Sequence, residues 1–141
     1  MPIKLDLPEE TFAVASIPVE RYPAVLESLR DIQAYLCLTR DRDEITLVLA
    51  ESLWQGIASL FPDAKVQSPW RMIRFDIVLD FSVVGFIAEI SQALAAADIP
   101  ILSLSSFRTD TILVPAASYA RAISALNPAL VTLNYTILAQ H

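Results

Sequence analysis

The sequence predicts an α+β fold of two ferredoxin-like modules, each a βαββαβ unit whose antiparallel sheet is covered by helices on one face. Three observations lead to this prediction. They are an internal repeat, a change from strand to helix periodicity at the same place in both copies, and a well-marked strand and helix ahead of the second copy. We place the modules at residues 1–68 and 69–141.

The repeat is found by shifting the sequence along itself by 66 residues, which aligns residues 36–60 with residues 102–126 without a gap. Nine of the 25 aligned pairs are identical, and the pairs Thr39/Ser105 and Glu44/Asp110 keep their chemistry. Chance agreement in so apolar a chain is about two or three pairs. The repeat therefore indicates a duplicated supersecondary unit.

Each copy is expected to form two strands joined by a tight turn and followed by a helix. Leu36 and Leu38 alternate with residues of the opposite face, as do Leu102 and Leu104 in the second copy. Apolar residues then recur at i, i+4 and i+7, the spacing of one helix face; they are Leu53, Ile57, Leu60, Tyr119, Ile123 and Leu126. We expect Pro62 and Pro128 to end these helices.

The second module is completed by elements on either side of its copy. Alternation over residues 73–79 predicts a strand that ends at Asp80, and a helix face over residues 83–97 follows, with Ser82 as its N-cap. Asp98 and Pro100 are expected to end that helix. Alternation over residues 131–137 predicts the closing strand.

The first module is less regular. Residues 12–17 are expected to form its opening strand, and residues 20–31 a helix that Pro18 and Pro23 keep short or irregular. Residues 64–68 are a weak closing strand, so the two repeats are expected to exchange or share strands.

Composition restricts the classes of partner. Ten basic and sixteen acidic residues give a formal net charge of −6, which repels a phosphate backbone, so we expect no nucleic-acid partner. The longest charge-free stretch, residues 122–141, is broken by polar residues and a proline, and residues 1–10 lack the pattern of a secretory signal. We therefore expect no membrane span and a cytoplasmic location. The apolar fraction of 55% leads us to expect a homo-oligomer.

Catalytic and metal chemistry lack their usual residues. His141 is the only histidine, Cys37 is the only cysteine, and no glycine-rich phosphate loop is present. We expect Cys37 to be a small packed residue and not a nucleophile. The sequence is thus predicted to have no catalytic residue, no metal and no cofactor, and not to be an enzyme.

Three segments carry a resemblance to a known family. They are LTRDRDEITLVLAE at 38–51, PWRMIRFDIVLDFSVVGFIAEISQALAAADIPI at 69–101 and LSLSSFRTDTILV at 102–114. Their ordered features are Trp70, the Asp80-Phe81-Ser82 corner, Gly85, and the Thr109-Asp110 turn before Ile112, Leu113 and Val114. The chain resembles the tandem ACT-domain proteins of the arginine-sensor and aspartate-kinase-regulatory type. ACT modules are regulatory and bind amino acids or similar small metabolites, usually where two modules pack side by side, so the resemblance implies a sensor that relays ligand binding to a partner protein.

The resemblance places the ligand against the loop between the first strand and first helix of the second module, which here is Asp80, Phe81, Ser82, Val83, Val84, Gly85 and Phe86. Free N–H groups at a helix start suit a carboxylate, and Gly85 lets a ligand approach the backbone. Asp110 is the candidate for the ligand's ammonium group, with Ser105 and Thr109 as hydroxyl contacts. The alternatives are an Asx-type turn at Asp110 and a plain cap and spacer at Ser82 and Gly85.

The first module departs from this pattern, since IPVERYP at 17–23 has no glycine, and a full pocket is not expected there. Thr39, Arg40 and Glu44 match the family's threonine, arginine and glutamate positions, so this hairpin is either the opposite wall of a shared site or a solvated turn. The alternative function is a ligand-free ACT-like module that binds a partner protein through its sheet edges or the apolar surface around Trp54, Phe61 and Trp70.

Overall fold

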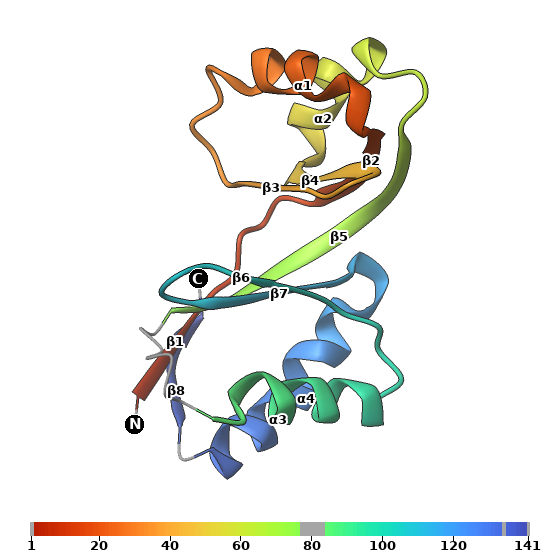
Figure 1. Ribbon diagram of the computed structural model, residues 1–141. Helices are drawn as coiled ribbons and strands as arrows, with labels where there is room; N and C mark the ends of the chain where they lie inside the picture. The colour runs from red at the N-terminus through yellow and green to blue at the C-terminus, as the bar shows by residue number, and fades with distance from the viewer. Residues whose placement is uncertain (1, 77–83, 134, 141) are drawn as a thin grey trace. The chain divides into compact units, whose positions relative to one another are not determined.

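The computed structural model of the chain describes residues 2–76, 84–133 and 135–140 (Figure 1). The chain divides into two compact units, and each has its own buried core. The first unit is Glu10–Trp70, and the second unit combines Met1–Glu9 with Arg71–His141. Strand β5, Lys65–Asp76, takes part in both, because residues 65–70 of this strand pair with the first unit and residues 74–76 pair with the second. It is therefore a strand that the two units share.

The first unit is an antiparallel sheet with short helices. Its elements are β2 (Phe12–Pro18), η1 (Val19–Arg21), α1 (Tyr22–Leu29), β3 (Leu36–Arg40), β4 (Glu44–Ala50), α2 (Glu51–Ile57), η2 (Ala58–Leu60) and the first half of β5, and the strand order is β3-β4-β2-β5. Ile17 alternates with less buried neighbours on β2, and it shares a core with Leu47 and Val25. The expected short first helix is confirmed, and Pro23 lies in its first turn, where its missing N–H costs no hydrogen bond.

The described residues of the second unit form five strands and two longer helices. Its elements are β1 (Pro2–Asp6), the second half of β5, α3 (Phe86–Ala96), β6 (Leu102–Ser105), β7 (Asp110–Pro115), η3 (Ala116–Ser118), α4 (Tyr119–Thr132) and β8 (Thr136–Gln140). The strand order is β6-β7-β5-β1-β8. Figure 1 shows α3 and α4 together on one side of this sheet. Its hydrophobic core includes Phe75, Ile90, Ile112 and Leu126.

The N-terminal residues 1–9 belong to the second unit, whereas the sequence analysis assigned them to the first module. Strand β1 pairs antiparallel with β5 and parallel with β8, and Ile3 and Leu5 on it are buried. This strand was not predicted, although Ile3, Leu5 and Leu7 alternate with Lys4 and Asp6.

The C-terminal part of the second unit also differs from the prediction. Pro128 lies inside α4 and does not end it. The predicted closing strand is present, but it begins at Thr136 and not at 131, because the helix continues to Thr132. Ala129 and Leu130 are buried in the core. Their burial explains why the helix extends past a proline that removes one of its hydrogen bonds.

The bounds of α3 are set by Gly85 and Asp98. Gly85, and not the expected Ser82, occupies the N-cap position, and Ser82 lies outside the described residues, as do residues 77–80 of the predicted strand. At the other end Asp98 has φ 58°, and the N–H groups of Asp98 and Ile99 donate to the carbonyls of Ala95 and Leu94 at 2.9 and 3.0 Å. This Schellman arrangement ends the helix, as the sequence predicted for Asp98.

The two copies of the repeat form the same elements, but at a shift of 65 residues and not 66. Leu38 pairs with Leu47 in the first hairpin, and Ser103 pairs with Ile112 in the second. The residues that precede the two helices, at 50 and 115, share nearly the same backbone angles, φ −54° with ψ 139° and 137°. The predicted residue matches, including Thr39/Ser105 and Glu44/Asp110, are therefore wrong by one position, which places matched side chains on opposite faces.

Two aromatic residues that were expected at a partner surface lie in the core of the first unit. Trp54 and Phe61 are 7% and 2% exposed, and their rings stack with centroids 6.4 Å apart and planes 17° apart. The predicted apolar surface around Trp54, Phe61 and Trp70 is therefore wrong for the first two, and Trp70 is half-buried.

Candidate functional site

The corner between β5 and α3 in the second unit is the first candidate site. Residues 80–83 of the predicted site lie outside the described residues. Val84 is 91% exposed, Phe86 is buried, and Gly85 between them has φ 90°. A Cβ built on Gly85 meets no heavy atom of the described residues within 4 Å, so these residues leave the space over Gly85 open.

The start of α3 has backbone groups available for a ligand. The N–H of Glu89 donates to the carbonyl of Gly85 at 3.0 Å, which closes the first turn. No side chain among the described residues caps the helix. The N–H groups of residues 86–88, which come before that first bond, have no partner within the helix. They and the helix dipole favour an anionic group at this corner.

The β6–β7 hairpin holds the other predicted residues of the second unit. Ser105 and Asp110 pair across the hairpin, and the Ser105 hydroxyl donates to Oδ1 of Asp110 at 2.8 Å. β7 pairs with β5, and Figure 1 shows the β6–β7 turn at the end of the sheet where β5 ends. The structure therefore brings Ser105 and Asp110 together, at the same end of the unit as the corner.

Thr109 has a local role in this hairpin. Its N–H donates to the hydroxyl of Ser106 at 3.1 Å, and its carbonyl accepts the N–H of Ser106 at 2.9 Å. The two hydroxyls are also 3.1 Å apart, and Thr109 is 8% exposed. These bonds close the turn between the strands.

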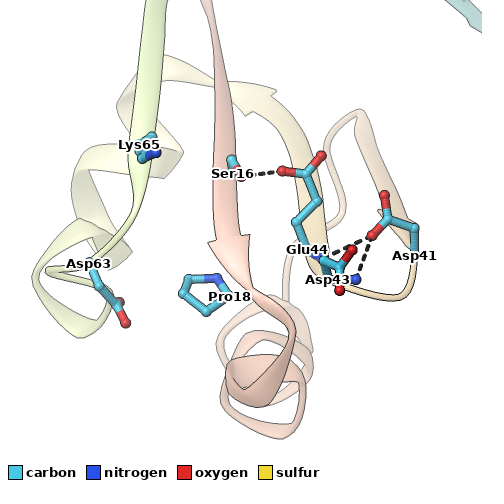
Figure 2. Close-up of a pocket in the computed structure, with 7 residues that line it drawn as sticks. All are labelled: Ser16, Pro18, Asp41, Asp43, Glu44, Asp63 and Lys65. Carbon is cyan, nitrogen blue, oxygen red and sulfur yellow. Dashed lines mark hydrogen bonds between the residues drawn. The ribbon is translucent and has the colours of Figure 1, made fainter.

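A second candidate site is a cavity of about 370 Å³ in the first unit (Figure 2). It is lined by the end of β2, the β3–β4 turn and the start of β5, with the residues Ser16, Pro18, Asp41, Asp43, Glu44, Asp63 and Lys65. In the first unit this is the place where β2 ends beside the β3–β4 hairpin. It corresponds in topology to the place in the second unit where β5 ends beside the β6–β7 hairpin. Four carboxylates and one ammonium group give it a negative charge that favours cations.

Most carboxylates of this cavity already have partners. The hydroxyl of Ser16 donates to Glu44 at 2.6 Å, and Arg21 forms a 3.4 Å ion pair with Asp63. Oδ1 of Asp41 accepts the N–H groups of Asp43 and Glu44 at 2.8 and 2.9 Å (Figure 2). The bonds from the N–H groups of Glu44 and Asp43 lower the pKa of Asp41 below its ordinary value.

The sequence analysis did not single out this cavity as a pocket. The signal was present in the acidic residues at 41, 43 and 44, which were interpreted as one wall of a shared site or as a solvated turn. The predicted residues Thr39 and Arg40 are exposed on β3 and do not line the cavity. The guanidinium carbon of Arg40 lies 4.4 Å from the centre of the Tyr22 ring, a cation–π contact within the first unit.

Within the described ranges, no group of three or more His, Cys, Asp or Glu side chains is arranged to hold a metal ion. No described helix is long and apolar enough to cross a membrane. Cys37 is half-buried on β3 and has a free thiol.

Comparison with known families gives a match over residues 65–128, which contain β5, the corner at Gly85, α3, the β6–β7 hairpin and most of α4. The matching family model is that of the ACT domain. Residues 65–128 are therefore similar to an ACT domain. The resemblance stated from the sequence is confirmed over this segment, and both the start of α3 at Gly85 and the Ser105–Asp110 pair lie in it.

Curated relatives point in the same direction. The cytosolic arginine sensor for mTORC1 subunit 1 from Homo sapiens is 31% identical over 131 residues, which cover 77% of this chain and 40% of the relative. The protein of the same name from Mus musculus is 31% identical over 130 residues, with 77% and 39% covered. The chain thus spans about two-fifths of the length of the curated relatives it matches.

Solved structures are similar over both units. A protein from Agobacterium tumefaciens has a TM-score of 0.77 at 20% identity, covering 100% of this chain and 96% of that one. The ligand-free regulatory subunit of aspartate kinase from Thermus thermophilus has a TM-score of 0.67 at 14% identity, with 89% and 95% covered. The expected ACT-like, ferredoxin-like fold is confirmed.

Proposed function

We propose that this protein binds a free amino acid for regulation, relays that binding to a partner protein and catalyses no reaction. The observation that carries the proposal is the start of α3 at Gly85, which no side chain among the described residues caps, together with the Ser105–Asp110 pair of the β6–β7 hairpin, whose turn lies at the end of the sheet where β5 ends. The printed names of relatives support it, since one is an arginine sensor and another is a regulatory subunit.

The start of α3 and the side chain of Asp110 suit the two charges of an amino acid. The free N–H groups at the start of α3 bind the α-carboxylate, with the helix dipole favouring its negative charge. Asp110 binds the α-ammonium, and its bond from Ser105 holds the carboxylate in place. The proposed site uses the second unit only, with Val84 and Gly85 beside the ligand.

Arginine is the first amino acid to test, because the relatives with about 31% identity are named as arginine sensors. The net charge of −6 also favours a cationic ligand, since the field of the whole chain attracts it. We place the protein in the cytoplasm, in line with the name of these relatives.

A thermal-shift panel of the twenty amino acids tests the proposal. A ligand present at 100 times its dissociation constant adds about 2.7 kcal/mol to the free energy of unfolding, which raises the Tm by several degrees. We expect one or a few amino acids to do so. If no amino acid shifts the Tm at about 10 mM, the sensor proposal is wrong for this chain.

Asp110→Asn locates the site, because it keeps the size and one acceptor but removes the charge that binds the ammonium. We expect the dissociation constant to rise at least about tenfold, or about 1.4 kcal/mol. The matched control is Asp31→Asn in the first unit, whose side chain is 93% exposed. A ligand that binds both variants like the wild type occupies another place, and the acidic cavity of the first unit is then the next to mutate.

A ligand-free interaction module is the second candidate function. The exposed, nearly uncharged outer face of α3 and α4 favours it, because such faces in folded proteins are usually covered by a partner. Binding of a partner protein with the same affinity with and without amino acids would support this candidate over the sensor.

A further inference from the structure

The outer face of α3 and α4 carries an open groove of about 470 Å³. Alanines of both helices and Pro128 form most of its lining, and Glu89, Gln92 and Thr132 add polar atoms. The guanidinium of Arg121 donates to the carbonyl of Ala97 at 2.9 Å, so the start of α4 lies beside the end of α3. The two helices are therefore antiparallel along the groove.

Charge is scarce on this helix layer. α3 has 11 residues and α4 has 14, and together they contain one acidic residue, Glu89, and one basic residue, Arg121. In the whole chain 18% of the residues are charged, so about four or five would be expected here. Helix faces that remain in water usually carry charged side chains. The composition of this face is that of a buried surface.

The two charges lie at opposite ends of the groove. Arg121 is four residues before Ala125, so it extends the α4 side of the groove next to the end of α3. Glu89 is in the first turn of α3, beside the end of α4. A two-fold axis that lies in the plane of the interface, through the middle of the groove, can bring opposite ends of the groove together in the two copies. It then places Glu89 of each copy against Arg121 of the other, which makes the surface complementary to itself.

We propose that this face binds a second copy of the chain, in a two-fold dimer with alanine-lined helices in contact at the centre and two Glu89–Arg121 pairs at the rim. Small side chains allow the helix backbones to approach closely. The helices are about 16 and 21 Å long, so the face is smaller than the about 800 Å² per partner of a typical stable interface. The proposed dimer is therefore a weak one, of the kind formed by interfaces at the low end of the size range.

Ala96→Glu tests the surface by placing a charge in the groove. Ala96 is exposed, so the variant folds; Ala95→Glu is the matched control, since Ala95 is also exposed on α3 but does not line the groove. Sedimentation equilibrium between about 5 and 500 μM without added ligand should give a dimer of the 15.6 kDa chain for wild type and Ala95→Glu, and a monomer for Ala96→Glu. A monomeric wild type over this range, or an Ala96→Glu variant that dimerises normally, overturns the proposal.

A charge exchange tests the two-fold arrangement. Glu89→Arg and Arg121→Glu should each raise the dimer dissociation constant at least about tenfold, because like charges then face each other. The double variant restores opposite charges and should return the constant to within about threefold of wild type. Circular dichroism checks that each variant is folded. A double variant as weak as the single variants shows that Glu89 and Arg121 do not meet, and a different partner or register then covers this face.

Discussion

Asp41 shows how one side chain fixes the β3–β4 turn of the first unit. Its carboxylate accepts two backbone N–H groups, and its own N–H donates to the carbonyl of Glu44 at 3.0 Å. The bonds to the N–H groups of Glu44 and Asp43 are formed by the ionised carboxylate, so they hold its pKa below the ordinary value. Because the pKa is lower in the folded state, Asp41 stabilises the fold above about pH 4, and this contribution is lost as the pH falls through the folded-state pKa.

Asp41→Asn should therefore destabilise the first unit at pH 7. In acid the wild type and the variant should have similar stability. The amide keeps an acceptor for the turn but lacks the charge that strengthens both bonds. Urea unfolding of wild type and variant at pH 7 and at about pH 2.5 measures the difference. A difference in stability that is the same at both pH values would mean that the charge of Asp41 plays no part.

Gly85 and Gly56 form a matched pair for a backbone test. Neither has a heavy atom of the described residues within 4 Å of a built Cβ, so substitution by alanine changes the backbone preference and not the packing. Gly85 has φ 90°, so Gly85→Ala should destabilise the second unit by about 1 kcal/mol. Gly56 lies in α2, so Gly56→Ala should stabilise the first unit by up to about 1 kcal/mol. Opposite signs of the change in Tm are expected, and equal signs would contradict the left-handed geometry at Gly85.

At the scale of elements, the sequence predicted the order of strands and helices well within the repeats but not the register of the copies. Nine identities favoured a shift of 66, whereas hairpin pairing and the strand-to-helix junctions use 65. In chains rich in leucine and alanine, identical residues occur easily by chance in an alignment that is shifted by one position. Register is instead set by which face of a strand meets the core, and Leu47 and Ile112 meet it here. The candidate residues Ser105 and Asp110 still lie together in the structure, because both belong to one hairpin.

Pro128 is an exception to the expectation that proline ends a helix. It sits inside α4, and the core residues that follow it keep the helix in place despite the missing hydrogen bond. Pro128→Ala should restore that bond and raise the free energy of unfolding of the second unit by about 1 kcal/mol or more. Pro62→Ala, in the loop after η2, should not stabilise. Thermal unfolding at low protein concentration compares the two, and a lower Tm for Pro128→Ala would mean that α4 requires the proline.

At the scale of the whole molecule, the second unit is built from segments that are distant in sequence. The second unit takes β1 from the start of the chain, and β5 serves both sheets. Dividing the sequence into two modules at residue 68 could not reveal this arrangement. β1 is a five-residue strand with ordinary alternation, and such a pattern does not indicate the strand with which it pairs. The internal repeat drew attention to residues 36–126 and away from the N-terminus.

Removal of residues 1–9 should therefore unfold the second unit and leave the first unit folded. β1 lies between β5 and β8, and Ile3 and Leu5 are 1% and 0% exposed, so its loss opens the sheet and removes core side chains. Amide hydrogen exchange should show lost protection in α3 and α4 and retained protection in α1 and β4. The single substitution Leu5→Ala should cost the second unit about 2 to 4 kcal/mol, whereas Lys4→Ala, at an exposed position on the same strand, should cost little. A shortened chain that keeps α3 and α4 protected would show that the second unit folds without β1.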